Sequence, residues 1–146
     1  MIVKVKKLDE RATLPTYGSA YAAGADLYAL VEGESLTIEA GETVLVRTGL
    51  SVEIPEGYVG LIYARSGLAT KKGLAPANKV GVIDSDYRGE VKVALFNQSG
   101  AAQTILAEER IAQLVIAPYL AVEYREADVL SDTARGEGGF GSTGNK

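Results

Sequence analysis

The stretch "EVKVALFN" (residues 90–97) decides the fold class, because apolar side chains recur in it at every second position. Such alternation is typical of a β-strand that turns one face to a core. Further short runs rich in β-branched residues follow along the chain, and Gly, Pro, Asn and Asp separate them. We predict strands in "IVKVK" (2–6), "SLTIEA" (35–40), "ETVLVRT" (42–48), "YVGLIYA" (58–64), "KVGVI" (79–83), "EVKVALFN" (90–97), "RIAQLVIAP" (110–118) and "AVEYRE" (121–126). Helical periodicity is nearly absent, so the sequence indicates an all-β chain, folded as an antiparallel sandwich, jelly roll or barrel.

One short helix is expected in "ARSGLATKKGLA" (residues 64–75). The helix would run over residues 67–72, with Ser66 as its N-cap and Gly73 at its end. Its N-terminal N–H groups would suit an anion, and Arg65 stands directly before it. The alternative is a surface loop that happens to be helical.

Composition narrows the classes of function. A chain of 146 residues suits one domain, and a net charge of -4 argues against a nucleic-acid partner held by bulk charge. With no Cys and no His, a disulfide, a thiolate metal site, a cysteine nucleophile and a histidine general base are excluded. No signal-peptide core and no run of roughly 18 apolar residues is present, so we expect a cytoplasmic protein without a membrane partner.

The segment "NKVGVIDSDYRGEV" (residues 78–91) holds the first candidate chemistry. Alternation places Asp84 and Tyr87 on opposite faces, with Arg88 and Gly89 closing a hairpin turn. Asp84 follows three apolar residues, so we expect it where a strand leaves the core, and a carboxylate there can hold and deprotonate a water. Tyr87 offers a flat ring for stacking on a sugar. An ordinary hairpin with a charged, solvated tip is the alternative.

Two further polar residues stand among apolar neighbours. Asp26 in "AAGADLYAL" (residues 22–30) would be buried and would need a partner, which in a purely structural role would be a backbone N–H. In "EERIAQLVIA" (residues 108–117), Arg110 and Gln113 have opposite parity on a strand, and both are candidates for the rim of a site. The amide of Gln113 inside an apolar strand also needs a partner.

The chain ends in "RGEGGFGSTGNK" (residues 135–146), which contains almost nothing that packs. Arg135 offers donors matched to phosphate oxygens, Phe140 offers a face for a base, and the glycines let the backbone approach a ligand closely. We therefore divide the chain into a β domain of residues 1–134 and a flexible Gly-rich tail of residues 135–146 that acts as a lid on the active site. An inert, frayed end is the alternative.

Five segments in this order resemble the homotrimeric dUTPases: "AGADLYA" (23–29), "ARSGLA" (64–69), "GVIDSDYRGEV" (81–91), "ERIAQLVI" (109–116) and "RGEGGFGSTG" (135–144). That family cleaves dUTP to dUMP and pyrophosphate, which keeps uracil out of DNA and supplies dUMP for thymidylate synthesis. The resemblance implies a distorted jelly-roll-like antiparallel β barrel or sandwich with one short helix. It also implies a homotrimer whose active sites are each built from three chains.

The resemblance implies a role for each residue of the nucleoside site. Asp84 would orient the attacking water as general base and bond the 3′-hydroxyl, and Tyr87 would stack under the deoxyribose and leave no room for a 2′-hydroxyl. The backbone at Lys92 would lie near the substrate. Hydrogen bonds to uracil would come from Asn78 and from the backbone of Gly81, Val82 and Ile83.

The resemblance also implies how the triphosphate is bound. Contacts to the phosphates are expected from Arg65, Ser66, Gly67 and, in the tail, Arg135. Gln113 would support the phosphates or a hydrated Mg²⁺ ion, which the triphosphate itself chelates, so no direct protein ligand is expected. Asp26 would hold the neighbouring segments in place. Phe140 would cover the uracil, and Gly141 would also contact the substrate.

Two positions depart from the family pattern. Ala64 stands where proline often precedes the arginine, and Glu108 stands where glycine often opens the fourth segment. These departures affect loop geometry and remove no functional group. The other functions to weigh are a dCTP deaminase of the same fold, a noncatalytic deoxynucleotide-binding protein and a structural jelly-roll assembly protein.

Overall fold

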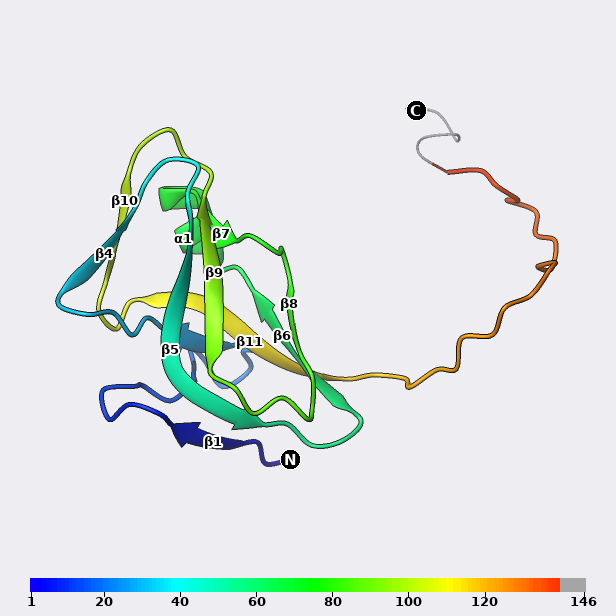
Figure 1. Cartoon of the computed structure of the whole chain (residues 1–146), viewed down its shortest axis with the longest axis horizontal. Coiled ribbons are helices and arrows are strands. Elements are labelled where there is room, and N and C mark those ends of the chain that lie inside the picture. Colours follow the sequence, from blue (N-terminus) through cyan, green and yellow to red (C-terminus); the bar gives the residue numbers. More distant parts are fainter. Residues whose placement is uncertain (140–146) are drawn as a thin grey trace.

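Two antiparallel β-sheets form the two layers of the body in a computed structural model that describes residues 1–139 (Figure 1). The first sheet has the order β1 (Lys4–Lys7), β5 (Thr43–Glu53), β9 (Val91–Asn97), β7 (Leu74–Pro76). The second has the order β2 (Thr16–Tyr17), β3 (Ala25–Tyr28), β11 (Arg110–Pro118), β6 (Tyr58–Tyr63), β8 (Gly81–Ile83). A separate pair joins β4 (Ser35–Ile38) to β10 (Gln103–Leu106). The predicted all-β fold is confirmed.

The alternation that predicted β9 is the alternation that fills the core. Val91, Val93 and Leu95 are buried, whereas Lys92 between them is exposed. The same side-chain period operates in β6, where Ile62 is buried and Tyr63 is exposed. Apolar residues from both sheets, the helix and the β4–β10 pair meet in one cluster, which includes Leu27, Ile38, Val46, Val52, Ile62, Leu68, Leu74, Val93, Leu95, Ile105, Ile111 and Leu114.

The helix α1 (Ser66–Lys72) lies where the sequence predicted it. It ends at Gly73, which has a left-handed φ of 66° and donates its N–H to the Ala69 carbonyl at 3.1 Å. The predicted cap was wrong by one residue, because Arg65 is the N-cap in an extended conformation and no side chain caps the first turn. Within residues 1–139, no helix has the length and apolar character needed to cross a membrane.

The predicted hairpin at Arg88 and Gly89 was wrong. Strand β8 pairs with β6, whereas β9 pairs with β5 and β7 in the other sheet. Residues 84–90 therefore cross from one layer to the other. Alternation on each side of a turn does not reveal which strand each side pairs with, and this is why the sequence suggested a hairpin.

The predicted strand at residues 121–126 was also wrong. From residue 119 to residue 139 the described chain contains no strand or helix, and it leaves the body after β11 (Figure 1). Its backbone therefore has no neighbouring strand of this chain to pair with. The strands β2, β3, β7 and β10, each of two to four residues, were not predicted.

A bulge in β5 needs a glycine. The pairing of β5 with β9 shifts register between Arg47 and Leu50, and Gly49 within this bulge has φ +69°. A Cβ atom at Gly49 would lie 2.7 Å from Cδ2 of Leu30 and 2.8 Å from Cβ of Ala12. Both the backbone conformation and the space therefore exclude a side chain here.

We expect Gly49→Ala to lower the free energy of unfolding by about 3 kcal/mol, because it adds crowding to a left-handed backbone. Gly33→Ala is the matched control, since Gly33 has φ +77° and no atom within 4 Å of an added Cβ. That control should cost about 1 kcal/mol, from the backbone alone. Urea unfolding of both variants measures the difference, and equal losses would show that the space around Gly49 relaxes without cost.

Candidate active site

A buried carboxylate organises one end of the five-stranded sheet. Asp26 on β3 is only 8% exposed, and it accepts a hydrogen bond from Arg65 Nε at 2.7 Å and another from Arg110 Nη1 at 3.2 Å. Arg65 Nη1 also donates to the Arg110 carbonyl at 3.3 Å. Burial of a charge is tolerated when it is paired in this way. The sequence predicted that Asp26 needs a partner, and this partner is a pair of guanidinium groups rather than a backbone N–H.

Gln113 lies in the same row of the sheet. The register places it opposite Asp26 on β3 and opposite Tyr63 on β6. Its Nε2 donates to the Ala64 carbonyl at 2.9 Å, which is the partner that the sequence required. A Cβ at Gly24 would lie 2.6 Å from Gln113 Oε1, so a glycine is needed for this close approach.

Arg110 belongs to this cluster because of a second bulge. The pairing of β11 with β3 shifts register between Arg110 and Ala112, and both Ile111 and Ala112 are buried. One extra residue brings Arg110 and Gln113 to the same face, so the predicted opposite parity was wrong. The signal for the bulge was the apolar pair Ile111 and Ala112 between two polar residues, since burying both requires a break in alternation.

The predicted nucleoside residues come together elsewhere, at a cavity of about 430 Å³. Asp84 directly follows β8, as predicted, and Tyr87 lies on the crossing segment, 45% exposed. Both sheets contribute to the lining, which consists of Leu45, Ile62, Asn78, Gly81, Val82, Ile83, Asp84, Tyr87, Glu90, Val91 and Lys92. All seven residues predicted for the nucleoside site therefore line one cavity.

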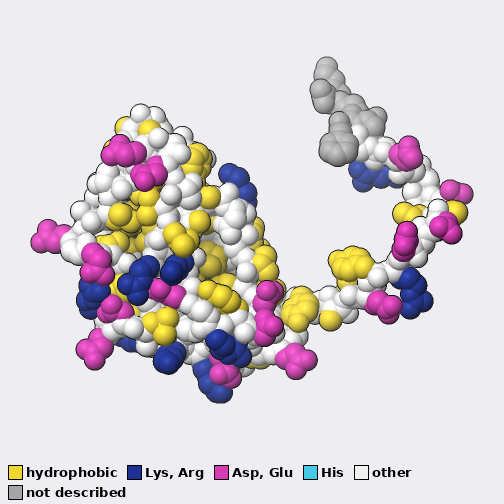
Figure 2. All heavy atoms as spheres, viewed as in Figure 1, with side chains coloured by type: hydrophobic (Ala, Val, Ile, Leu, Met, Phe, Trp, Pro, Cys, Tyr) yellow, Lys and Arg dark blue, Asp and Glu magenta, His cyan; other side chains and the backbone are white. Residues whose placement is uncertain are grey.

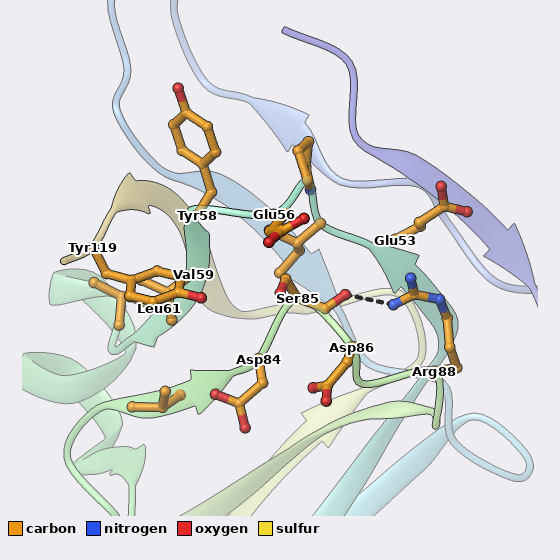
Figure 3. A pocket seen from close by; sticks show the side chains of 13 residues that line it. Glu53, Glu56, Tyr58, Val59, Leu61, Asp84, Ser85, Asp86, Arg88 and Tyr119 are labelled. Atoms are coloured by element: carbon orange, nitrogen blue, oxygen red, sulfur yellow. Dashed lines mark hydrogen bonds between the residues drawn. The ribbon is translucent and has the colours of Figure 1, made fainter. Parts of the chain in front are cut away.

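A larger cavity of about 930 Å³ shares Asp84, so this residue borders two hollows. Figure 3 shows its lining around Tyr58, Tyr119 and the loop that carries Ser85 and Arg88. Arg88 Nη1 donates to the Ser85 carbonyl at 2.6 Å and fixes the turn of that loop. The sequence did not predict this cavity.

Within these two groups, Asp84 and Arg65 lie toward opposite ends of β6, whereas Gly81 pairs with Ile62 near the Arg65 end. Arg65 is the second residue after the end of β6, whereas Ile83, next to Asp84, pairs with Gly60 near its beginning. The six residue-to-residue steps from Val59 to Arg65 would span about 20 Å in an extended chain. One chain therefore does not bring the carboxylate of Asp84 to the guanidinium of Arg65. The exposed residues Ser66 and Gly67, at the start of α1, lie beside Arg65.

The tail residues are only partly described. Arg135 is exposed, and its Nε donates to the Gly138 carbonyl of the tail itself at 2.7 Å. Phe140 and Gly141 lie outside the described residues. The lid role of this tail and the domain division at residue 134 stay predictions.

Comparison with known proteins identifies the family of the chain. The model of the dUTPase family matches residues 10–144. The chain belongs to the dUTPase family. The deoxyuridine 5'-triphosphate nucleotidohydrolase of Nautilia profundicola is 52% identical over 144 residues, covering 99% of each chain. That of a Hydrogenobaculum species is 51% identical over 146 residues and covers all of both chains.

Solved structures of this family resemble the protein over almost its whole length. The dUTPase of Staphylococcus bacteriophage 80alpha with dUPNHPP superposes with a TM-score of 0.88 at 30% identity, covering 98% of each chain. The dUTPase from phage phi11 of S. aureus gives 0.81 at 26% identity, covering 91% of this chain and all of the other. Members of this dUTPase family use a divalent metal ion.

Glu108 shows why the family often has glycine at its position. Its φ is 59°, which lies in the left-handed region that favours glycine. Its N–H still donates to the Ala29 carbonyl at 3.0 Å, so the turn into β11 is kept. This departure from the family pattern strains one residue and leaves the cluster around Asp26 intact.

We expect Asp26→Asn to lower the free energy of unfolding by about 2 kcal/mol, because two half-buried guanidinium groups lose their counter-charge. The control is Asp9→Asn, since hydrogen bonds from Arg11 lower the pKa of Asp9 to about 2 but this pair is exposed to solvent. The control should lose less stability, because solvent screens a surface pair. Chemical denaturation tests both, and a larger loss for Asp9→Asn would contradict a structural role for Asp26.

Proposed function

We propose that the protein hydrolyses dUTP to dUMP and pyrophosphate as a homotrimer, in active sites shared between copies. Membership of the dUTPase family supports the reaction. The observation that carries the shared site is the separation of Asp84 from Arg65 along β6. A triphosphate nucleotide needs both groups at once. The nucleoside half of one copy, which is the cavity that includes Asp84, would therefore meet the phosphate half of another copy, which is the cluster around Arg65.

The nucleoside half would bind deoxyuridine in the 430 Å³ cavity. Asn78 and the backbone between Gly81 and Ile83 line it and would pair with uracil. Cytosine would present a donor where the site also has one, and the resulting unpaired buried group disfavours it. The ring of Tyr87 would occupy the space that a ribose 2′-hydroxyl needs.

The phosphate half would use a guanidinium that is already fixed. Asp26 engages Nε of Arg65, and the Arg110 carbonyl engages Nη1. The Nη2 atom is left to donate to a phosphate oxygen, with little entropy lost on binding. Ser66 and Gly67 follow Arg65 directly and complete this half.

The metal of the proposal is Mg²⁺, bound through the substrate phosphates. Gln113 suits a hydrated ion beside them, because it donates through Nε2 to Ala64 and its Oε1 is an oxygen acceptor of the kind that Mg²⁺ and its waters prefer. Within residues 1–139 there is no group of three or more His, Cys, Asp or Glu side chains placed to hold a metal. When bound, the ion would neutralise charge on the phosphates.

An apolar area beside the phosphate half supports contact between copies. On the outward face of the five-stranded sheet, Val115, Leu61 and Val82 form one cross-strand row, and Val59 pairs with Ala117 in the next. Val82 is 64% exposed in the single chain. Apolar side chains gathered beside a polar cluster are typical of a protein–protein interface.

The chain after β11 also supports assembly. It extends away from the body, and Figure 2 shows apolar side chains along it. The large apolar side chains exposed there are Tyr119, Leu120, Val122, Tyr124, Val129 and Leu130. In the proposal this segment takes the tail to a neighbouring copy, where Arg135 and Phe140 close the site.

Hydrolysis would proceed by in-line attack of water on the α-phosphorus. Asp84 would accept the proton of that water as general base. Arg65 and Arg135 would stabilise the charge that develops on the phosphate oxygens. The proposal includes a cytoplasmic location, which the absence of Cys fits.

Other functions of the same fold are less well supported. The similar curated proteins are named nucleotidohydrolases, which does not favour a dCTP deaminase. The carboxylate at Asp84 does not favour a noncatalytic binding protein. The deciding assay is pyrophosphate release from dUTP, dTTP, dCTP and UTP in the presence of Mg²⁺, with dUTP expected to react fastest.

We expect Asp84→Asn to lower kcat for dUTP by a factor of about 10² to 10⁴, while KM changes little, because the general base is lost and the binding contacts remain. The matched control is Asp86→Asn, which removes a carboxylate from the same loop. It should keep most of the activity. Steady-state kinetics of both variants decide, and a fast Asp84→Asn enzyme would remove Asp84 from the base role.

Shared sites predict that two inactive variants restore each other. Chains with Arg65→Ala and chains with Asp84→Asn should each be inactive, yet an equal mixture refolded together should recover about one quarter of the wild-type rate. In a mixed trimer some sites take both intact halves from different copies. Mixing without refolding is the control, and no recovery after verified exchange of subunits would show that each site lies within one chain.

A further inference from the structure

We infer that Glu90 is a positioning residue that fixes the ring of Tyr87 and thereby sets the preference for deoxyribose over ribose. This inference rests on the proposed function, because it assumes that Tyr87 contacts the sugar. The new element is the contact that holds the ring of Tyr87 in place. Glu90 is a side chain whose anchoring role the sequence did not indicate.

The carboxylate of Glu90 is held inside the β5 bulge. Its side chain is 13% exposed, and its Oε1 accepts from the Gly49 N–H at 2.9 Å and from Arg47 Nε at 3.0 Å. Its Oε2 accepts from the same Arg47 Nε at 3.2 Å and lies 3.8 Å from Lys92 Nζ. The Gly49 N–H is free to point at Glu90 because the bulge removes it from the ladder.

Two hydroxyl groups of β5 hold the loop on either side of Glu90. Thr48 Oγ1 donates to the Val91 carbonyl at 2.6 Å, and Ser51 Oγ donates to the Arg88 carbonyl at 2.7 Å. Both Thr48 and Ser51 are buried. Hydrogen bonds that involve side chains therefore attach the segment from Arg88 to Val91 to β5, at the bulge and at Ser51 just beyond it.

The ring of Tyr87 is attached to this fixed segment. Its hydroxyl donates to the backbone carbonyl of Glu90 at 3.0 Å. The ring also lies against Gly89, where an added Cβ would be 2.5 Å from Cζ of Tyr87. Any movement of the Glu90 peptide therefore moves the acceptor that orients the phenol.

A ring excludes a 2′-hydroxyl only if it cannot move by the width of one oxygen. The ring is partly exposed, so packing alone does not hold it. Its orientation depends on the Glu90 carbonyl, and the position of that carbonyl depends on the carboxylate in the bulge. Loss of the carboxylate should let the ring yield to ribose while the uracil contacts of Asn78 and Gly81 remain.

The test compares kcat/KM for dUTP and for UTP in Glu90→Ala, Glu90→Gln and the wild type. We expect Glu90→Ala to lower the dUTP-to-UTP ratio about tenfold, mainly through a lower KM for UTP. Glu90→Gln should recover most of the ratio, because its Oε1 still accepts from Gly49. Tyr87→Phe should lower the ratio similarly, and adding it to Glu90→Ala should lower it little further, since both act on one ring.

The control for general destabilisation is Gly33→Ala, which strains a turn between β3 and β4 and should leave the ratio unchanged. An unchanged ratio in Glu90→Ala, with the wild type active on dUTP, would overturn this inference alone. Equal loss of activity on both substrates would also overturn it, because it would indicate a merely structural residue. A wild type that does not hydrolyse dUTP would overturn the proposed function and this inference with it.

Discussion

The ion pair between Asp26 and Arg65 is the contact on which the proposed phosphate half of the site depends. It joins β3 to the end of β6 across the intervening strand β11, and so it fixes where α1 begins. Asp26 is almost fully buried, so replacing Arg65 would leave a buried carboxylate with one guanidinium partner fewer. Arg110 adds a second guanidinium to the same carboxylate, and Gln113 lies opposite Asp26 in the sheet and close to Gly24.

Much of this arrangement could be predicted from the sequence, because the determining signals are local. The alternation of Val91, Val93 and Leu95 identified a half-buried strand, and Gly73 identified the end of the helix. Polar groups among apolar neighbours need hydrogen-bond partners, and the structure provides one for Asp26 and for Gln113, as predicted. The order of the five motifs indicated the family before any geometry was known, although no single motif does so.

The rest depends on contacts between residues far apart in the chain. The bulge that brings Arg110 to Asp26 exists because β3 offers one residue where β11 has two. The anchoring of Glu90 requires the bulge at Gly49, 41 positions earlier. Alternation around residues 84–90 is compatible with a hairpin and with a crossing between sheets, and only the pairing of β8 with β6 decides. Periodicity also marks residues 121–126 as a strand, but a strand needs a neighbour.

The proposed nucleoside cavity is lined in part by residues of the hydrophobic core. Ile62, Ile83 and Val91 line it, and the same three side chains belong to the hydrophobic core between the layers. A base bound there would contact side chains of both sheets. A nucleotide bound in this cavity would bind the folded state and not the unfolded chain. The nucleotide complex should therefore have a higher melting temperature than the free protein. Core substitutions under the cavity would in turn be felt as changes in affinity.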